Sequence, residues 1–186
     1  MNKMPDIRLV RVDFRLMHGQ VVTAWLKQVS ANAILIVDDQ LAADKFLAQV
    51  FLMAKPQGVK VAIRSVEKAV AAFQKGVFGN EKMLILFKTV ESVKRAYDLG
   101  FPLEKLQLGG LGNGTDKVMI SKELSLNEEE VEKLLDMQDK GVEITLQMTP
   151  RDSVIKLDDA VKMVHEHTKE SVSYTHLRAH ETSLHL

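Results

Sequence analysis

The sequence predicts a single α/β domain with an open, mainly parallel, twisted sheet of about seven strands and helices on both faces. Short, almost purely apolar runs recur along the chain, as expected for strands that are buried on both sides. Amphipathic segments with helix-capping residues lie between most of these runs. The chain has 186 residues, of which 46% are hydrophobic and 27% are charged, and this composition fits one globular core. We therefore assign one domain to residues 1–170.

The first half of the chain predicts strands that alternate with helices. Strands are expected over 7–12, 33–37, 59–63 and 83–87, and helices over 19–29, 41–55 and 66–75. In the first helix, apolar residues recur every three or four positions and therefore share one face. Pro56 and Gly58 end the second helix, and Ser65 stands where the third helix needs an N-cap.

The second half continues this alternation. Thr89 is positioned to cap the next helix, and strands are expected over 106–108, 117–120 and 142–148. Asn127 or Ser125 begins an acidic helix over 128–140, which Gly141 ends. A closing helix is expected over 157–167.

Residues 171–186 differ in composition from the rest of the chain. The tail contains histidines without a helical or strand period, at His176, His180 and His185. Residues 172–182 resemble the translation of a sequencing-library adapter, so we expect this tail to be non-native and exclude it from the fold prediction. A histidine-rich metal site, with His165 and His167 added, is the less favoured interpretation.

The composition argues against several classes of protein. Equal numbers of basic and acidic residues, 25 of each, do not favour a binder of nucleic acid or of membrane surfaces in general. The absence of cysteine removes disulfides, thiolate metal sites and cysteine nucleophiles. The sequence shows no secretory signal, and no run approaches the roughly 18 apolar residues that a spanning helix needs. We expect a cytoplasmic protein that serves a membrane system only as a soluble partner.

The turn after the first strand carries the residues best suited to chemistry. Residues 11–21, Arg-Val-Asp-Phe-Arg-Leu-Met-His-Gly-Gln-Val, leave an apolar strand, place one histidine in a turn and then begin a helix. A helix N-terminus offers unpaired amides to an anion, and arginine forks match phosphate oxygens. Neutral imidazole is nucleophilic near pH 7. The pattern predicts a site that places a phosphoryl group on His18.

The side chains around His18 have structural and functional interpretations. Arg15 is expected to bind phosphate oxygens rather than form only a surface ion pair. Arg11 interrupts an apolar strand and needs a partner, either Asp13 or Asp38. For Arg11, a structural ion pair and a place in the phosphate pocket are equally open. Asp13 would repel phosphate, so we expect it to hold Arg15 or the imidazole N–H.

The neighbouring positions are less specific. Gln20 either donates to phosphate or is an exposed residue of the first helical turn, and Gly19 allows close approach of the backbone. Asp38 and Asp39 are favoured as a turn and helix cap over a magnesium site.

Polar and glycine residues follow several strands at the edge where ligands collect in open α/β sheets. These are Asp13, Asp38-Asp39, Arg64-Ser65, Lys88-Thr89 and the loop 109–114. The glycine-rich loop leads into a strand rather than a helix, which argues against nucleotide binding. We expect it to form a flexible wall of the active site or of a partner surface. Together these strand ends are typical of a phosphate site.

The motif resembles a known family. It is similar to the active-site signature of the IIB component of the mannose/fructose/sorbose branch of the bacterial phosphoenolpyruvate-dependent sugar phosphotransferase system (PTS). The matching positions are Asp13, Arg15, His18, Gly19 and Gln20, and weaker agreement extends over about residues 5–165.

This resemblance implies a cytoplasmic phosphotransferase with a catalytic histidine. His18 would accept a phosphoryl group from a IIA phosphohistidine and pass it to a sugar taken up through membrane IIC and IID subunits. The resemblance implies no cofactor and no metal ion.

Two other classes of protein are considered. A receiver-like signalling domain would form an acyl phosphate on Asp13, Asp38 or Asp39, with magnesium and Lys88 as cations, and would not use His18. A regulatory module with the IIB fold would bind partners without turnover.

Overall fold

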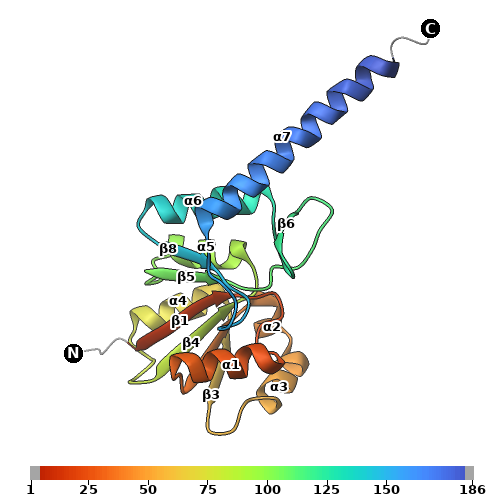
Figure 1. Ribbon diagram of the computed structural model, residues 1–186. Coiled ribbons are helices and arrows are strands. Elements are labelled where there is room, and N and C mark those ends of the chain that lie inside the picture. The colour runs from red at the N-terminus through yellow and green to blue at the C-terminus, as the bar shows by residue number, and fades with distance from the viewer. Residues whose placement is uncertain (1–4, 183–186) are drawn as a thin grey trace.

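The computed structural model describes residues 5–182, without the side chains of residues 20–21 and 170–182. Its main sheet has seven strands in the order β3-β2-β4-β1-β5-β8-β9 (Figure 1). The strands are β1 Asp6–Val12, β2 Ala33–Val37, β3 Lys60–Arg64, β4 Lys82–Phe87, β5 Lys105–Leu108, β8 Glu143–Leu146 and β9 Ile155–Lys156. All neighbours in this sheet pair in parallel except β8 and β9. The open, mainly parallel sheet predicted from the sequence is confirmed.

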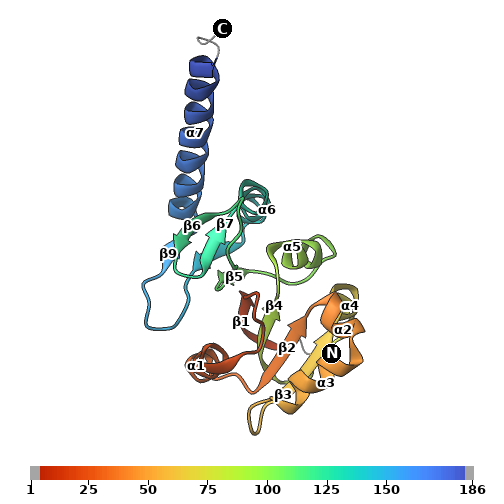
Figure 2. The same cartoon turned by 90° about the vertical axis from the view of Figure 1, so that its right-hand side faces the viewer.

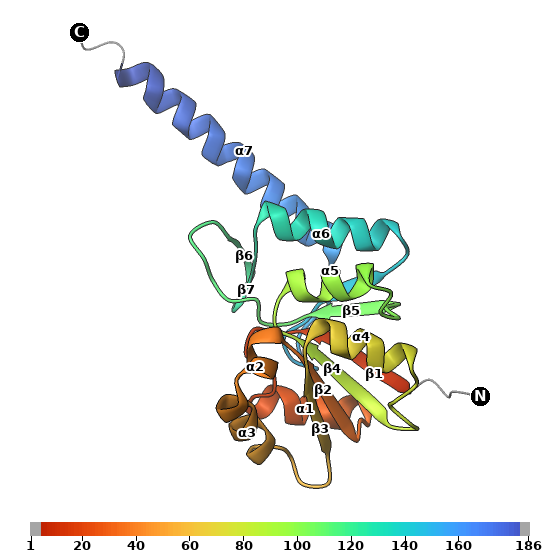
Figure 3. The same cartoon turned by 180° about the vertical axis from the view of Figure 1, so that it is seen from behind.

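Helices cover both faces of the sheet, as predicted. They are α1 Gly19–Val29, α2 Asp39–Ala43, α3 Lys45–Met53, α4 Val66–Gln74, α5 Val90–Asp98, α6 Glu128–Asp139 and α7 Leu157–Thr182. One apolar core packs α1 to α3 against one face, and a larger core packs α4 to α7 against the other. Figure 1 shows α1 and α3 in front of the sheet, and Figure 3 shows α4 to α6 from behind. Strand β2 is buried along its whole length, which explains its purely apolar sequence.

Two expectations about the elements are wrong in detail. The helix expected over 41–55 is two helices, because Asp44 leaves the helical conformation and caps α3 through the N–H of Leu47, at 2.9 Å. The strand expected over 117–120 is β6 (Val118–Ser121), which pairs with β7 (Leu124–Leu126) as an antiparallel hairpin outside the main sheet. Figure 2 shows this hairpin beside the start of α7. The seventh strand of the main sheet is instead β9, which was not predicted.

Helix α7 is longer than the expected range of 157–167. Its first turns bury Leu157, Ala160 and Val164 in the larger core, and its later turns extend away from the body (Figure 1). The backbone of residues 171–182 is helical, although the side-chain sequence there shows no helical period. The non-native origin of this tail stays a prediction. Within residues 5–182, no helix is long and apolar enough to cross a membrane.

The local capping predictions are confirmed. The Ser65 hydroxyl accepts from the N–H of Lys68, and the Thr89 hydroxyl accepts from the N–H of Ser92, at 3.4 and 3.1 Å. Between the two candidates for the start of α6, Asn127 is the N-cap and accepts from Glu130 N at 2.9 Å. Side-chain acceptors at these positions satisfy amides that have no partner within the helix.

Asp39 links three helices near the carboxyl end of β2. Its Oδ1 accepts from the N–H of Val66 at 2.9 Å, and its Oδ2 accepts from the guanidinium of Arg95. Burial raises the pKa of Asp39, but the hydrogen bonds from Arg95 and Val66 N and the charge of Arg95 outweigh it and leave the pKa below its ordinary value. A carboxyl with a lowered folded-state pKa stabilises the fold above its unfolded pKa. This stabilisation disappears as pH falls through the folded pKa.

We therefore expect Asp39→Asn to lower the free energy of unfolding by about 0.5–1 kcal/mol at neutral pH, a modest loss because this ion pair is partly exposed. Urea unfolding of both proteins at neutral and acidic pH measures the difference, which is expected to vanish in acid. A difference of equal size at both pH values would contradict an ionic origin.

Candidate active site

The segment between β1 and α1 is a tight turn held by the core. The N–H of Leu16 donates to the Asp13 carbonyl at 2.9 Å, and the N–H of Phe14 donates to the Gly110 carbonyl at 2.8 Å. Leu16 has a φ of 55°, a left-handed conformation that is costly for a branched residue, and its buried side chain helps to hold it there. Arg15 and His18 flank the buried pair Leu16 and Met17 and remain partly exposed.

His18 occupies the N-cap position of α1, with an extended backbone at φ −134° and ψ 143°. Its side chain makes no capping hydrogen bond, and the first turn of α1 contains no acidic residue. The first-turn amides therefore lack a side-chain acceptor from the cap and are suited to an anion.

The imidazole of His18 is only partly exposed. His18 is partly buried, and its Nδ1 is covered by protein without a hydrogen-bond partner among the described residues. Nδ1 can meet a second molecule only after the ring turns or the neighbouring chain moves.

Asp13 connects the two arginines of the motif. Its side chain is only 1% exposed. Its Oδ2 accepts from Arg11 Nη2 at 3.1 Å, and its Oδ1 accepts from both Nε and the backbone N–H of Arg15 at 3.2 Å. Of the two partners considered from the sequence, Asp13 holds Arg15 rather than the imidazole. Asp13 therefore fixes the direction in which Arg15 reaches.

Arg11 is enclosed at the centre of the fold, with its side chain 1% exposed. Besides Asp13, it donates through Nη1 to Gln107 Oε1 at 2.6 Å and to the carbonyl of Gln147 at 2.7 Å. Nη2 also donates to the carbonyl of Met148 at 2.9 Å. Burial lowers the pKa of Arg11, and the nearby Asp13 only partly offsets this. Its partner is Asp13 rather than Asp38, and the contacts are those of a structural ion pair.

Arg15 bridges a buried and a half-exposed carboxylate. Besides its contact with Asp13, its Nη1 lies 2.7 Å from Glu123 Oε2. The side chain of Arg15 is 20% exposed and that of Glu123 is 44% exposed. Nη2 of Arg15 is covered and has no partner within the part of the chain that is described. The guanidinium therefore has N–H groups available as hydrogen-bond donors next to the turn that carries His18.

The two residues after His18 begin α1. Gly19 has a φ of 35°, and an added Cβ would meet nothing within 4 Å, so glycine is favoured there by backbone conformation rather than by space. The side chain of Gln20 lies outside the described residues, so its contact with phosphate stays a prediction.

Asp38 and Asp39, which follow β2, have structural partners of their own. Asp38 caps α2 by accepting from the N–H of Leu41 at 2.8 Å, and Asp39 is bound to Val66 N and Arg95. These contacts fit the turn-and-cap interpretation. Among the side chains that the structure describes, no group of three His, Cys, Asp or Glu residues is arranged to hold a metal ion.

The sequence matches the family model for the PTS system sorbose subfamily IIB component over residues 7–172. The chain belongs to this family. It is 37% identical over 146 residues to the sorbose-specific EIIB component of the PTS from Lacticaseibacillus casei, covering 78% of this chain and 89% of that relative. Components of the IIB type are phosphotransferases by family, and they work with IIA and membrane IIC and IID components.

Solved structures show the same IIB fold. The crystal structure of manxB from Thermoanaerobacter tengcongensis is similar with a TM-score of 0.80 and 38% identity, covering 86% of this chain and 96% of that one. The IIBSor domain of the sorbose permease from Klebsiella pneumoniae has a TM-score of 0.79 and 29% identity, covering 84% and 96%.

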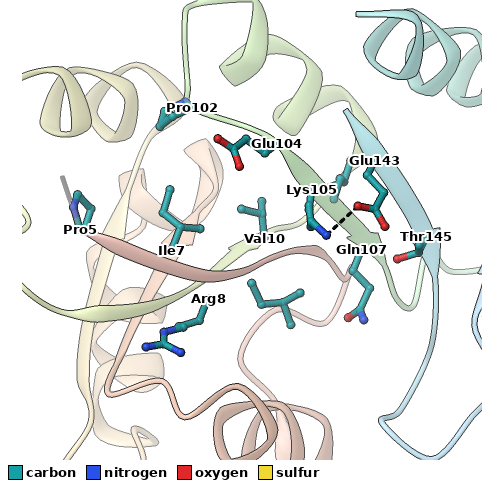
Figure 4. Close-up of a pocket in the computed structure, with 12 residues that line it drawn as sticks. Pro5, Ile7, Arg8, Val10, Pro102, Glu104, Lys105, Gln107, Glu143 and Thr145 are labelled. Atoms are coloured by element: carbon teal, nitrogen blue, oxygen red, sulfur yellow. Dashed lines mark ion pairs between the residues drawn. The ribbon is translucent and has the colours of Figure 1, made fainter. Parts of the chain in front are cut away.

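A hollow in this IIB chain lies away from the motif. It has a volume of about 620 Å³ and lies over β1, β5 and β8, where Lys105 Nζ pairs with Glu143 Oε2 at 2.8 Å (Figure 4). None of the predicted site residues lines it. Gln107 both lines the hollow and accepts from Arg11, so it separates this hollow from the buried ion pair. The candidate active site is therefore the turn around His18 rather than this hollow.

The glycine-rich loop is tied to the motif rather than being a flexible wall at this end. The N–H of Gly109 donates to the Val12 carbonyl at 2.8 Å, and the Gly110 carbonyl accepts from Phe14 N. A Cβ on Gly109 would overlap Nη2 and Cζ of Arg11. The glycine is needed because the buried guanidinium fills the space where a side chain would start.

We expect Gly109→Ala to lower the free energy of unfolding by about 1–3 kcal/mol, because Arg11 is held by several hydrogen bonds and cannot move aside freely. Gly79→Ala is the control, since its Cβ would meet only the end of the flexible Glu81 side chain, at 3.2 Å. Urea unfolding of both variants measures the effect. Equal stability of the two variants would contradict the packing role of Gly109.

Sequence reasoning missed Glu123, Gln107 and the carbonyls of Gln147 and Met148. Glu123 reaches Arg15 across 108 positions of sequence, from a hairpin that was not predicted. The sequence around Glu123 gives no indication that its carboxylate contacts Arg15. The only available hint was that a buried Arg11 must find several acceptors.

Proposed function

We propose that this chain is a cytoplasmic IIB phosphocarrier of a sugar-transporting PTS. His18 takes a phosphoryl group from a IIA phosphohistidine and passes it to a sugar that enters through membrane IIC and IID subunits, to which the chain binds peripherally. Membership of the family supports the phosphotransferase activity. The observation that carries the role of His18 is its N-cap position on α1, in the same turn as the partly exposed Arg15.

The proposed reaction has two transfers that balance without a cofactor. In the first, the Nδ1 lone pair of His18 bonds to phosphorus as the donor P–N bond breaks, the electron pair returns to the donor imidazole, and that ring takes up a proton as the Nε2 proton of His18 is released. In the second, a sugar hydroxyl oxygen bonds to phosphorus and the P–N bond to His18 breaks. The hydroxyl proton goes to the released imidazole. The transition states of such transfers are loose, so placement and charge neutralisation supply most of the catalysis.

The polar residues of the motif and Gly19 each have a role in this proposal. Arg15 and the first-turn amides of α1 neutralise the transferred group, and Gly19 lets it approach the backbone. Gln20 adds a side-chain donor. Asp13 orients Arg15, and Arg11 orients Asp13 from the core. Docking of IIA uncovers Nδ1, which is shielded in the free protein.

The test is phosphoryl transfer from a IIA domain. The donor is phosphorylated with labelled phosphate and shown to label a sorbose-type IIB relative, and it is then mixed with the purified chain. We expect close to one labelled phosphoryl group per chain, and return of the label to unlabelled, unphosphorylated IIA added in excess. A chain that takes no label from donors active on such relatives would refute a carrier function and favour a non-catalytic IIB-fold module.

A further inference from the structure

The contact between Arg15 and Glu123 is not explained by the roles assigned above. Arg15 already has a buried carboxylate partner, Asp13, which contacts its Nε. Glu123 contacts a different nitrogen, Nη1, at 2.7 Å, and its side chain is 44% exposed. Arg15 is thus shared between one enclosed carboxylate and one that solvent can reach.

Glu123 comes from an element that is separate from the main sheet. It lies in the turn of the β6–β7 hairpin, and its carbonyl accepts from the N–H of Leu111 at 3.1 Å. Its φ of 63° is left-handed, which is unfavourable for a residue with a side chain. A strained residue that holds a functional side chain is a reason to look for a role at that position.

A phosphoryl group on His18 and the Glu123 carboxylate would compete for the guanidinium of Arg15. A protein-bound phosphoryl group carries about two negative charges near pH 7, and its oxygens match an arginine fork. The nearby carboxylate would repel that charge. Asp13 is enclosed and also bound by Arg11, whereas the half-exposed Glu123 can turn into water at little cost.

We propose that Glu123 is a positioning residue that acts through Arg15, and this inference rests on the proposed carrier function. In the unphosphorylated protein Glu123 occupies Nη1 of Arg15 and keeps the guanidinium in place. When His18 carries the phosphoryl group, Arg15 turns its donors to the phosphate and Glu123 moves into solvent. Glu123 forms its ion pair with Arg15 again when the phosphoryl group leaves His18, and this favours transfer of the group to the sugar.

The direction of the effect follows from these two states. The carboxylate stabilises the unphosphorylated form through the ion pair and destabilises the phosphorylated form through repulsion. Replacing it by an amide therefore shifts the equilibrium with IIA toward phosphorylated His18. The shift is expected to be about two- to fivefold, the size that a partly exposed ion pair supports.

The experiment compares Glu123→Gln with the wild type at equilibrium with phosphorylated IIA. Glu132→Gln, an exposed position on α6, makes the same charge change elsewhere and is expected to match the wild type. Glu123→Asp keeps the charge on a shorter side chain, and its equilibrium is expected to lie between those of the wild type and Glu123→Gln. This variant also tests the inference if Glu123→Gln is poorly folded. An equilibrium in Glu123→Gln that equals the wild type, or shifts toward phosphorylated IIA, would overturn the inference.

A second measurement tests whether Glu123 acts through Arg15. The NMR signal of the Arg15 Nη1 protons, which contact Glu123, is compared in the unphosphorylated proteins and is expected to move in Glu123→Gln but not in Glu132→Gln. An unchanged Arg15 signal in Glu123→Gln would also overturn the inference. Failure of the proposed carrier function can be distinguished from failure of this inference, because the wild type itself would then take up no label.

Discussion

Replacing His18 with alanine is expected to abolish phosphoryl uptake from IIA while leaving the protein folded. No other side chain of the turn supplies a nucleophile that can form a P–N bond. The Nδ1 of His18 makes no hydrogen bond within the described structure, and the side chain does not cap α1. The free energy of unfolding is therefore expected to change by no more than about 1 kcal/mol. Labelling by phosphorylated IIA and urea unfolding measure the two effects.

The matched control for His18→Ala is His165→Ala. His165 is exposed on α7, and its Nε2 lies 3.3 Å from Glu128 Oε2, far in the sequence from the motif. This variant is expected to take up label like the wild type. Retained uptake in folded His18→Ala, or loss of uptake in both variants, would be incompatible with a specific role for His18.

Arg11→Met is expected to give the largest loss of stability among the variants considered, about 3–5 kcal/mol. The substitution removes one of the two cationic partners of the buried Asp13. It also leaves the carbonyl of Gln147 without its guanidinium donor, and the carbonyl of Met148 with only the Trp25 Nε1–H, at 3.2 Å. Urea unfolding gives the free energy, and phosphoryl uptake of the remaining folded protein is expected to fall because Asp13 no longer holds Arg15 in one position.

Arg8→Ala provides the comparison within the same strand. Arg8 is partly exposed and pairs with Asp6 at 2.7 Å near the amino end of β1. Its loss is expected to cost less than about 1 kcal/mol. If Arg11→Met were no more destabilising than Arg8→Ala, the buried cluster would not have the structural role assigned to it.

The fold was predictable because its signals are local. Buried parallel strands such as β2 read as apolar runs, and side-chain caps such as Ser65, Thr89 and Asn127 stand next to the helices they begin. The break between α2 and α3 was not predicted because no proline or glycine stands next to Asp44 to indicate the end of a helix. Its effect depends on one capping hydrogen bond, to Leu47 N.

The site was predictable only as far as the continuous motif extends. Residues 13–19 lie in one turn, so their proximity needs no knowledge of the fold. The partners of the two arginines come from β5, the hairpin β6–β7 and the segment after β8, all distant in sequence. The glycine-rich loop was expected to form a flexible wall, and only the position of the Arg11 guanidinium explains why a side chain is excluded at Gly109.

The chemical linkage of the protein-bound phosphoryl group tests the central claim most directly. After labelling by phosphorylated IIA, the protein is divided and treated with mild acid or with alkali, and the retained label is counted. The account predicts a label that is lost in acid and stable in alkali, as for a phosphohistidine at His18. A label lost in alkali would show an acyl phosphate on an aspartate such as Asp13, Asp38 or Asp39, as in a receiver-like domain, and would contradict the account.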